Sequence, residues 1–242
     1  MSTLFISDLH LEDDRPEMTH LLLEFLDQRA SQADALYILG DLFEYWVGDD
    51  VLTSTATSVG RALSKLSSSS VPVRFIHGNR DFLLGGEYAA QAGMTLLDDC
   101  TTIDLYGTPT LLLHGDILCT GDLEYQAFRR QVRDPVWQQE FLSRSVAERL
   151  NLANQARQAS AEHTFSVPDE IMDVSRQAVL EAFAKHGVQH MIHGHTHRPG
   201  VEEYDLQTGI ASRTVLGDWY RHGSVLAVNP GKSELITLPL SQ

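Results

Sequence analysis

The 242-residue chain contains few cysteines. Its two thiols, Cys100 and Cys119, follow no regular spacing. Two isolated cysteines cannot form a disulfide framework, and they cannot supply the thiolate ligands typical of a structural zinc site. We therefore expect a protein of a reducing compartment, in which any metal is held by other ligand types.

Positive charge and long apolar runs are also scarce. Lys and Arg number 18 against 33 Asp and Glu, which gives a net charge of −15. Because a polyanion repels such a chain, we expect no sequence-independent nucleic-acid binding, and a nuclease is disfavoured. The first residues, MSTLFISDLHLEDD, have no basic segment, and Asp8 and His10 interrupt their apolar run. The expectation is neither a signal peptide nor a membrane span, hence a cytoplasmic protein attached at most to a membrane surface.

The chain does contain short apolar runs that end in Gly, Asp or His, a pattern that predicts buried strands. They are TLFIS before Asp8, ALYILG before Asp41, VPVRFIHG before Asn79, PTLLLHG before Asp116 and VQHMIHG before His195. Amphipathic stretches at 20–30 and 59–66 predict helices between them, so we expect an α/β fold with its ligands at the carboxyl ends of strands. Asp8 to Asp41, Asp41 to Asn79 and Asn79 to His114 are each about as long as one βαβ unit.

The interval from His114 to His195 is about twice as long, which predicts an insertion at about 119–165. Apolar residues recur there at helical spacing, so the insertion is expected to be helical. Six arginines make it a basic cap on an acidic protein, or alternatively a solvated helical hairpin with ordinary salt bridges: Arg129, Arg130, Arg133, Arg144, Arg149 and Arg157. After His197, alternating apolar residues and Gly turns predict an antiparallel sheet. Without repeats or linkers, residues 1–242 are expected to form a single domain.

The predicted strand ends carry seven possible metal ligands: Asp8, His10, Asp41, Asn79, His114, His195 and His197. Imidazoles, carboxylates and an amide oxygen suit Mn²⁺, Fe²⁺ or Mg²⁺. Seven ligands are too many for one tetrahedral ion and indicate two ions about 3.5–4 Å apart, with Asp41 as the candidate shared carboxylate. A bridging water that ionises near neutral pH would then hydrolyse a phosphoester or phosphoanhydride without a protein nucleophile.

The order D-x-H, G-D, G-N-x-D, H-G-D, G-H-x-H resembles the calcineurin-like metallophosphoesterase superfamily and spans most of the chain. Within it, FISDLHL, ALYILGDLFEYWVGDD, FIHGNRDFLLG, LLHGDILCT and MIHGHTHRP are similar to the UDP-2,3-diacylglucosamine diphosphatase family of the lipid A pathway. The resemblance implies an αββα sandwich with a helical lid and a di-manganese site. It also implies cleavage of UDP-2,3-diacylglucosamine by a metal-bridged hydroxide to UMP and 2,3-diacylglucosamine 1-phosphate (lipid X). The implied location is the cytoplasmic face of the inner membrane, as a peripheral protein, with a monomer favoured.

The resemblance also implies roles for individual residues. One ion would be held by Asp8, His10, Asp41 and His197, and the other by Asp41, Asn79, His114 and His195. The latter four are the implied catalytic residues. The implied substrate contacts are Asn79, Arg80, Asp122, Arg157, Ser160, Thr164 and His195. His77 and His193 fall outside the ligand set and are expected to support the site from beneath.

Arg80 favours a phosphoanhydride substrate. Many members of the superfamily have a histidine here that can act as a general acid, whereas arginine cannot donate a proton at neutral pH. A phosphate leaving from a pyrophosphate is weakly basic, so a guanidinium that stabilises its charge is sufficient. The alternative is that Arg80 only pairs with Asp81.

A lipid substrate also needs an apolar chamber, for which the candidate lining residues are Trp46, Phe82, Phe128, Phe141 and Val146. Two other functions stay open at this point. One is hydrolysis of a soluble nucleotide diphosphate conjugate by the same chemistry. The other is a binding scaffold derived from a metallophosphoesterase, which the complete ligand set disfavours.

Overall fold

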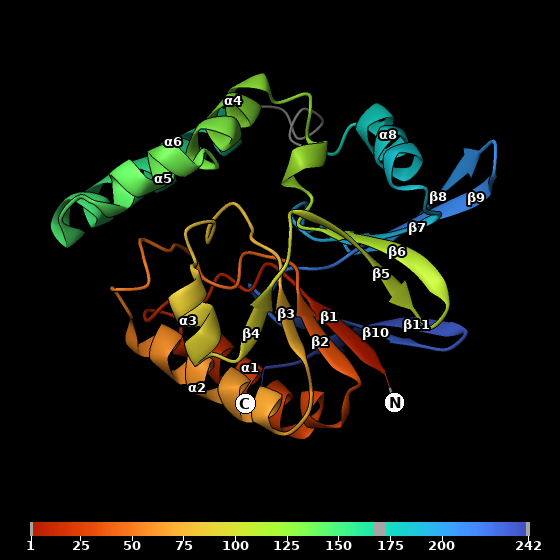
Figure 1. Cartoon of the computed structure of the whole chain (residues 1–242), viewed down its shortest axis with the longest axis horizontal. Coiled ribbons are helices and arrows are strands. Elements are labelled where there is room, and N and C mark those ends of the chain that lie inside the picture. The colour runs from red at the N-terminus through yellow and green to blue at the C-terminus, as the bar shows by residue number, and fades with distance from the viewer. Residues whose placement is uncertain (1, 167–172, 241–242) are drawn as a thin grey trace.

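The computed structural model describes residues 2–166 and 173–240, with the backbone alone for 161–166. Two sheets stack against each other, and helices cover both outer faces (Figure 1). The layers follow the order α, β, β, α, which confirms the αββα sandwich.

The first sheet has the strand order β11-β10-β1-β2-β3-β4. Four of its strands, from the centre of the sheet to one edge, run parallel. They are β1 (Thr3–Ile6), β2 (Ala35–Ile38), β3 (Val73–Phe75) and β4 (Met94–Leu96). The connecting helices cover its outer face: α1 (Pro16–Gln28), α2 (Ser54–Ser68) and α3 (Gly86–Gln91). Both α1 and α2 begin earlier than predicted, because Pro16 suits a first helical position and Thr53 caps α2 by accepting a hydrogen bond from Ala56 N.

The second sheet has the strand order β5-β6-β7-β9-β8. Its strands are β5 (Cys100–Leu105), β6 (Thr108–Leu113), β7 (His190–His193), β8 (Gly200–Leu206) and β9 (Gly209–Val215). Helix α8 (Arg176–His186) covers its outer face.

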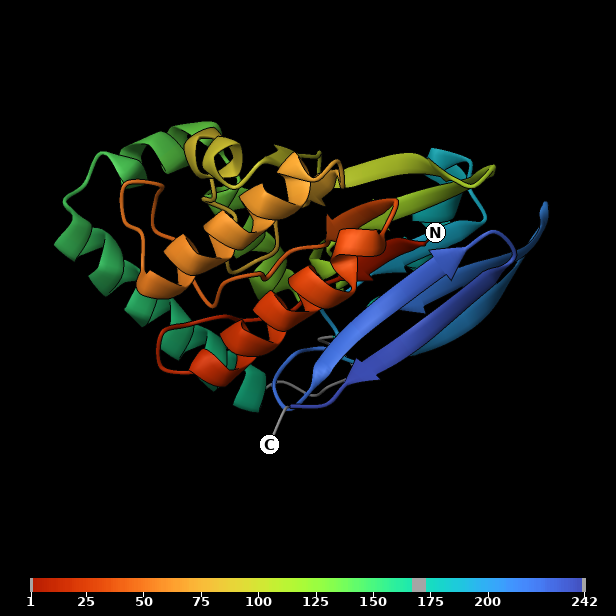
Figure 2. The ribbon, with the colours of Figure 1, turned by 90° about the horizontal axis from the view of Figure 1, so that it is seen from below.

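Two topological predictions were wrong. The interval from Asn79 to His114 is not one βαβ unit, because β4 and β5 intervene and β6 pairs antiparallel with β5 in the second sheet. The hairpins after His197 form as expected but do not make one sheet. The β8–β9 hairpin completes the second sheet, whereas β10 (Gly223–Asn229) and β11 (Lys232–Leu238) extend the first beyond β1 (Figure 2).

Three apolar clusters separate the four layers. The middle cluster, between the sheets, includes Phe5, Leu39, Leu112, Ile192 and Leu226. All four residues of β1 are buried, because the strand is covered on both faces. This explains why the strands read as continuous apolar runs rather than as alternating patterns.

The predicted insertion contains three helices that extend away from the sandwich (Figure 1). They are α4 (Leu123–Val132), α5 (Pro135–Leu142) and α6 (Val146–Ser166). Asp134 caps α5, and Ser145 and Glu148 form a capping box at the start of α6. The apolar residues that recur at helical spacing in the sequence therefore belong to two helices rather than one. Among the described residues, no helix combines the length and the apolarity needed to cross a membrane.

Candidate functional site

The loops that follow β1, β2, β3, β6 and β7 meet at one end of the sandwich. Because β1, β2 and β3 run parallel to one another in the first sheet, and β6 and β7 do so in the second, their carboxyl ends lie at the same edge of each sheet. All seven residues predicted as metal ligands come together there. They are Asp8, His10, Asp41, Asn79, His114, His195 and His197.

Their polar atoms converge in two groups that meet at Asp8 and Asp41. Asp8, His10 and His197 form one group, in which Asp8 Oδ1 lies 3.3 Å from His197 Nε2. Asp8, Asp41 and His114 form the other. Asp41 Oδ2 lies 3.8 Å from His10 Nε2 and 3.7 Å from His114 Nε2, so this oxygen faces both groups.

Asn79 joins the second group to His195. Its Oδ1 lies 2.9 Å from His114 Nε2 and 3.0 Å from His195 Nδ1. His114 Nδ1 donates to the carbonyl of Leu39 at 2.8 Å, which leaves its Nε2 free to face the site. Asn79 Oδ1, His114 Nε2 and His195 Nδ1, from three different loops, therefore face one another.

Two unpartnered atoms indicate that the site fits metal ions. Asp8 Oδ1 and His10 Nε2 are buried without a hydrogen-bond partner. The other carboxylate oxygen of Asp8 accepts hydrogen bonds from Ser7 Oγ at 2.6 Å and His195 N at 2.9 Å. Burial of a carboxylate oxygen and an imidazole nitrogen without a partner is costly, and a cation between them removes that cost. The nitrogen and oxygen donors suit borderline-to-hard divalent ions.

The backbone is strained at most of these positions. Non-glycine residues rarely adopt positive φ, and where they do the strain is often part of a functional site. Five of the seven residues have φ between 49° and 69°: Asp8, His10, Asp41, His195 and His197.

Two glycines allow the loops to approach closely. A Cβ at Gly78 would lie 2.1 Å from Asp41 Oδ1, and a Cβ at Gly194 would lie 2.2 Å from Asp8 Oδ2. Any side chain at either position would therefore displace a carboxylate of the site.

The buried carboxylates and imidazoles of this site shift one another's pKa values. The carboxylates of Asp8 and Asp41 outweigh burial and raise the pKa of His114 and His197, so the site attracts positive charge. Burial raises the pKa of Asp8, but the adjacent imidazoles of His197 and His114 together outweigh burial and lower it below its usual value, so this carboxylate is ionised at neutral pH. Burial and the neighbouring His114 lower the pKa of His195 to about 4, which keeps its imidazole neutral. Ionised carboxylates and neutral imidazoles are the forms that coordinate metals.

The predicted substrate contacts surround this site. A cleft of about 460 Å³ contains Arg80, Asp122, Ser160 and His195, together with the candidate ligands His10, Asp41 and His197. An adjoining cavity is lined by Asn79, Arg80, Arg157 and Ser160. Arg80 and Ser160 line both spaces and so mark where they meet. Thr164 belongs to α6, but its side chain lies outside the described residues.

The adjoining cavity, of about 320 Å³, is largely apolar. Four of the five predicted lining residues are found there: Trp46, Phe82, Phe128 and Phe141. The fifth prediction, Val146, was wrong, because this residue lies at the start of α6 and does not line the cavity. Trp137 and Leu152 contribute to the lining and were not predicted, since their spacing on the insertion did not distinguish the inner face of each helix.

Several arginines of the insertion are used in salt bridges. Arg129 pairs with Asp116 and Asp99, each at 2.7 Å, and Arg133 pairs with Asp99 at 2.9 Å. Arg149 pairs with Asp50. The alternative of ordinary salt bridges therefore holds for these three arginines, although they are largely buried rather than solvated.

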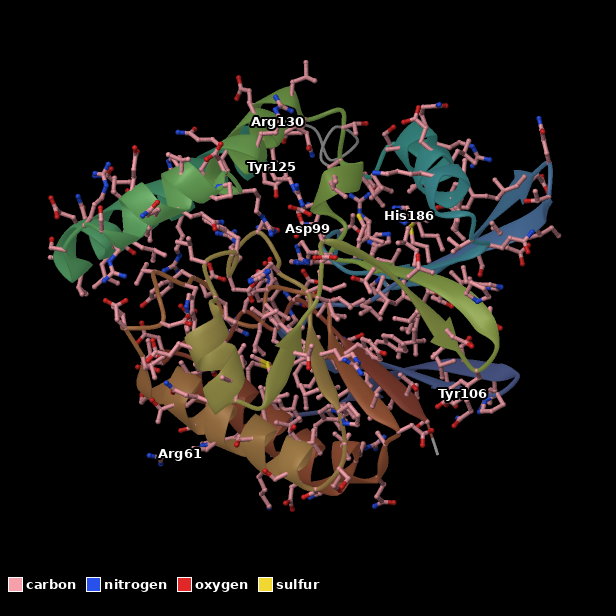
Figure 3. All side chains as sticks on the ribbon, viewed as in Figure 1. Arg61, Asp99, Tyr106, Tyr125, Arg130 and His186 are labelled. Carbon is pink, nitrogen blue, oxygen red and sulfur yellow. The ribbon has the colours of Figure 1, made fainter. Side chains whose placement is uncertain are left out.

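Some residues near the site were missed or used differently from the predictions. Tyr125 extends from α4 toward the site and lies with its ring 6.1 Å from that of His195 (Figure 3). Its only sequence signal is its position three residues after Asp122, whose side chain accepts from Tyr125 N. Asp81 accepts backbone hydrogen bonds from Gly78 and Leu42, whereas the ion pair of Arg80 is with Glu44 at 3.9 Å.

The two histidines expected to support the site hydrogen-bond to the backbone of the loops that carry its ligands. His77 Nε2 donates to the carbonyl of Leu84 at 2.7 Å. His193 is completely buried, with Nδ1 donating to the carbonyl of Gly194 at 2.7 Å and Nε2 accepting from Arg213. These contacts fix the loops that carry Asn79 and His195.

Comparisons with known proteins agree with this geometry. The UDP-2,3-diacylglucosamine hydrolase of Stenotrophomonas maltophilia (strain K279a) is 52% identical over 245 residues, covering 98% of this chain and 99% of the relative. The protein of the same name from Xanthomonas axonopodis pv. citri is 50% identical over 247 residues, covering 99% of this chain and 100% of the relative. A solved archaeal phosphodiesterase shares the fold, with a TM-score of 0.50, 14% identity and coverage of 98% of this chain and 100% of that one. The model of the calcineurin-like phosphoesterase family matches residues 1–199, and the chain therefore belongs to that family.

Proposed function

We propose that this protein hydrolyses the pyrophosphate bond of UDP-2,3-diacylglucosamine to give UMP and 2,3-diacylglucosamine 1-phosphate (lipid X) in lipid A biosynthesis. The observation that carries the proposal is the identity of about 50%, over nearly the whole chain, to proteins named UDP-2,3-diacylglucosamine hydrolase. The adjacency of a polar cleft and an apolar cavity supports it, because the substrate has a diphosphate next to two acyl chains.

The proposed cofactors are two divalent ions, with Mn²⁺ as the preferred metal. Asp8, His10, Asp41 and His197 would hold one ion, and Asp41, Asn79, His114 and His195 the other. Asp41 is the proposed shared ligand because its Oδ2 faces a histidine of each set. When bound, such a pair of ions lowers the pKa of water and stabilises negative charge on phosphoryl oxygens.

The residues of the chain then orient the diphosphate and stabilise the leaving phosphate. Arg80 lies in both the cleft and the cavity, and its guanidinium keeps its positive charge at neutral pH. It can therefore stabilise the charge that develops on a departing phosphate, a weakly basic group that needs no proton donor. Arg157 and Ser160, both on α6, line the same cavity and are proposed to contact the substrate from the insertion.

Helices α4, α5 and α6 form the proposed lid of a single domain spanning residues 1–242. Aromatic residues from both the lid and the sandwich line the cavity, including Phe128 and Phe141 above and Trp46 and Phe82 below. An acyl chain in this cavity would be shielded from water, which stabilises the complex by about 0.8 kcal/mol for each buried methylene. Asp122, which caps the first helix of the lid, lines the cleft and is a further proposed contact with the substrate.

Exposed apolar side chains on the lid helices support a peripheral location on the cytoplasmic side of the inner membrane. Large apolar side chains are exposed there, with Leu123 at 75% and Val136 at 64%. Co-sedimentation with vesicles of phosphatidylglycerol and phosphatidylethanolamine tests this location. Glutamine at both positions is expected to reduce the bound fraction, and unchanged binding would contradict the proposal. Light scattering of the purified protein tests the proposed monomer.

The substrate is tested by comparing acylated and non-acylated UDP-sugars in the presence of Mn²⁺. We expect rapid hydrolysis of UDP-2,3-diacylglucosamine and little hydrolysis of UDP-N-acetylglucosamine. Phe128→Ala should lower kcat/KM for the acylated substrate alone, because its side chain lines the apolar cavity. Equal turnover of the two substrates would favour a soluble nucleotide diphosphate conjugate instead.

A further inference from the structure

Glu44 lies between the metal-ligand loops and the lid. It follows Asp41 by three residues, and its backbone N donates to the carbonyl of Leu11 at 3.1 Å. A β-bridge between Leu11 and Phe43 further joins the loop after β2 to the loop after β1. The side chain of Glu44 is only 15% exposed. The backbone thus places this carboxylate firmly beside the site.

One carboxylate oxygen of Glu44 orients a candidate metal ligand. His10 Nδ1 lies 2.9 Å from Glu44 Oε2, and the carboxylate can only accept, so Nδ1 is the donor. His10 Nε2 then carries the lone pair, and this is the buried atom that has no hydrogen-bond partner. A carboxylate behind a histidine is the usual arrangement for fixing the tautomer and ring orientation of a metal-binding imidazole.

The other oxygen faces two arginines of the proposed substrate site. Glu44 Oε1 lies 3.4 Å from Arg157 Nε and 3.9 Å from Arg80 Nη1. Arg80 comes from the loop after β3, whereas Arg157 comes from α6 of the lid. Each guanidinium has five N–H donors, so both arginines can also bind an anionic ligand such as a diphosphate.

We propose that Glu44 is a positioning residue for the reaction, which orients His10 through one oxygen and gathers Arg80 and Arg157 through the other. This inference rests on the proposed function for the role of the arginines, but not for the role of His10. Glu44 thereby joins a candidate metal ligand to an arginine of the lid through a single side chain.

Two substitutions separate the two contacts. In Glu44→Gln, the amide oxygen can still accept from His10 Nδ1, whereas the negative charge that attracts the arginines is lost. We expect Mn²⁺ affinity within about threefold of wild type and a KM about tenfold higher, as for the loss of a charge-assisted contact. Glu44→Ala removes both contacts, so the KM should rise and Mn²⁺ affinity should fall about 10–100-fold.

Glu12→Ala is the matched control. Glu12 Oε2 lies 3.8 Å from Arg157 Nη2, so this variant loses a carboxylate beside the same arginine without touching His10. Its Mn²⁺ affinity should equal that of the wild type. Mn²⁺ binding is measured by titration calorimetry on the metal-free full chain without substrate, and circular dichroism checks that each variant is folded.

The measurements test the two roles of Glu44 and the proposed function separately. Wild-type Mn²⁺ affinity in Glu44→Ala, or equal losses of affinity in Glu44→Ala and Glu44→Gln, would overturn the role of Glu44 toward His10. An unchanged KM in Glu44→Gln would overturn its role toward the arginines. If the wild-type protein does not hydrolyse UDP-2,3-diacylglucosamine, the proposed function fails, while the Mn²⁺ titrations still decide the His10 contact.

Discussion

Asn79 Oδ1 lies 2.9 Å from His114 Nε2 inside the site. Because His114 Nδ1 donates to the carbonyl of Leu39, a neutral His114 would point its lone pair at the amide oxygen. Two facing acceptors repel each other unless a proton or a metal ion lies between them. Burial lowers the pKa of His114, but the carboxylates of Asp41 and Asp8 outweigh this effect and raise it. The pocket therefore attracts positive charge at this point.

Metal ions should for this reason stabilise the fold, and Asn79 should be needed for the effect. At about 100 times the dissociation constant, a ligand that binds only the folded state adds roughly 2.7 kcal/mol to the free energy of unfolding. We expect Mn²⁺ to raise the Tm of EDTA-treated wild-type protein in differential scanning fluorimetry. The increase should be much smaller in Asn79→Ala.

Asn151→Ala provides the control for this measurement, since Asn151 is exposed on α6. It should respond to Mn²⁺ like the wild type. An equal rise of Tm in Asn79→Ala and wild type would exclude Asn79 from the metal site.

Asp41→Ala should reduce turnover to less than a tenth of the wild-type rate. Its Oδ2 faces histidines of both groups, so its loss should weaken both proposed ion sites, and a shared ligand is expected to contribute several kcal/mol. Circular dichroism should still report a folded protein, because other ligands and the apolar core are unchanged. Retention of more than a tenth of the activity would contradict the role of Asp41 as shared ligand.

Arg80→Ala should lower kcat about 100-fold without loss of metal, as expected when a group that stabilises transition-state charge is removed. Arg80→Lys should restore part of the rate, since lysine returns the positive charge but cannot form the bidentate hydrogen bonds of a guanidinium. Metal content, measured by atomic emission on the purified variants, is the check on an indirect effect. A fall in bound metal together with kcat would mean that Arg80 acts through the metal site.

The ligand loops could be predicted from sequence because their signal is local. A short apolar run ending in Asp, Asn or His predicts a strand and the residue at its carboxyl end, and all seven such residues do meet. The assignment of β6 to a second sheet could not be predicted, since its pairing with β5 and β7 is not encoded in the run itself. Parallel and antiparallel neighbours leave the same pattern when a strand is buried on both faces.

The ion-pair partners of the insertion arginines could not be predicted from the sequence either. Arg149 pairs with Asp50, 99 residues earlier, and Arg129 pairs with Asp99, 30 residues earlier. A count of charges in one segment predicts a basic cap, but the distant carboxylates that neutralise it become visible only in the fold. Glu44 and Tyr125 were missed for the same reason, because each acquires its role through contacts from other loops.

Arg129→Met should destabilise the protein more than most surface changes do. Asp116 is 2% exposed and accepts from Arg129 Nε at 2.7 Å, so the substitution leaves a buried carboxylate without its charged partner. Loss of one member of a buried ion pair costs about 3–5 kcal/mol. Urea unfolding in the presence of EDTA measures the change without a contribution from metal.

The neighbouring Arg130→Met is the matched control. Arg130 lies on the same helix and is exposed, pointing outward from α4 (Figure 3). Its replacement should alter the free energy of unfolding by at most about 0.5 kcal/mol. Similar effects of the two substitutions would show that Arg129 and Asp116 contribute no more than a surface pair.

Cys119 should make the fold sensitive to alkaline pH. The side chain is 2% exposed, and burial, together with the nearby carboxylate of Asp116, raises its pKa from 9.0 to about 12. In the unfolded chain the thiol ionises above about pH 9, whereas in the folded protein it stays protonated. Its contribution to stability is therefore fully present below pH 9 and is lost as the pH rises toward 12. From pH 8 to 10, wild type should lose about 1 kcal/mol more than Cys119→Ala in urea unfolding, and parallel losses would contradict the raised pKa.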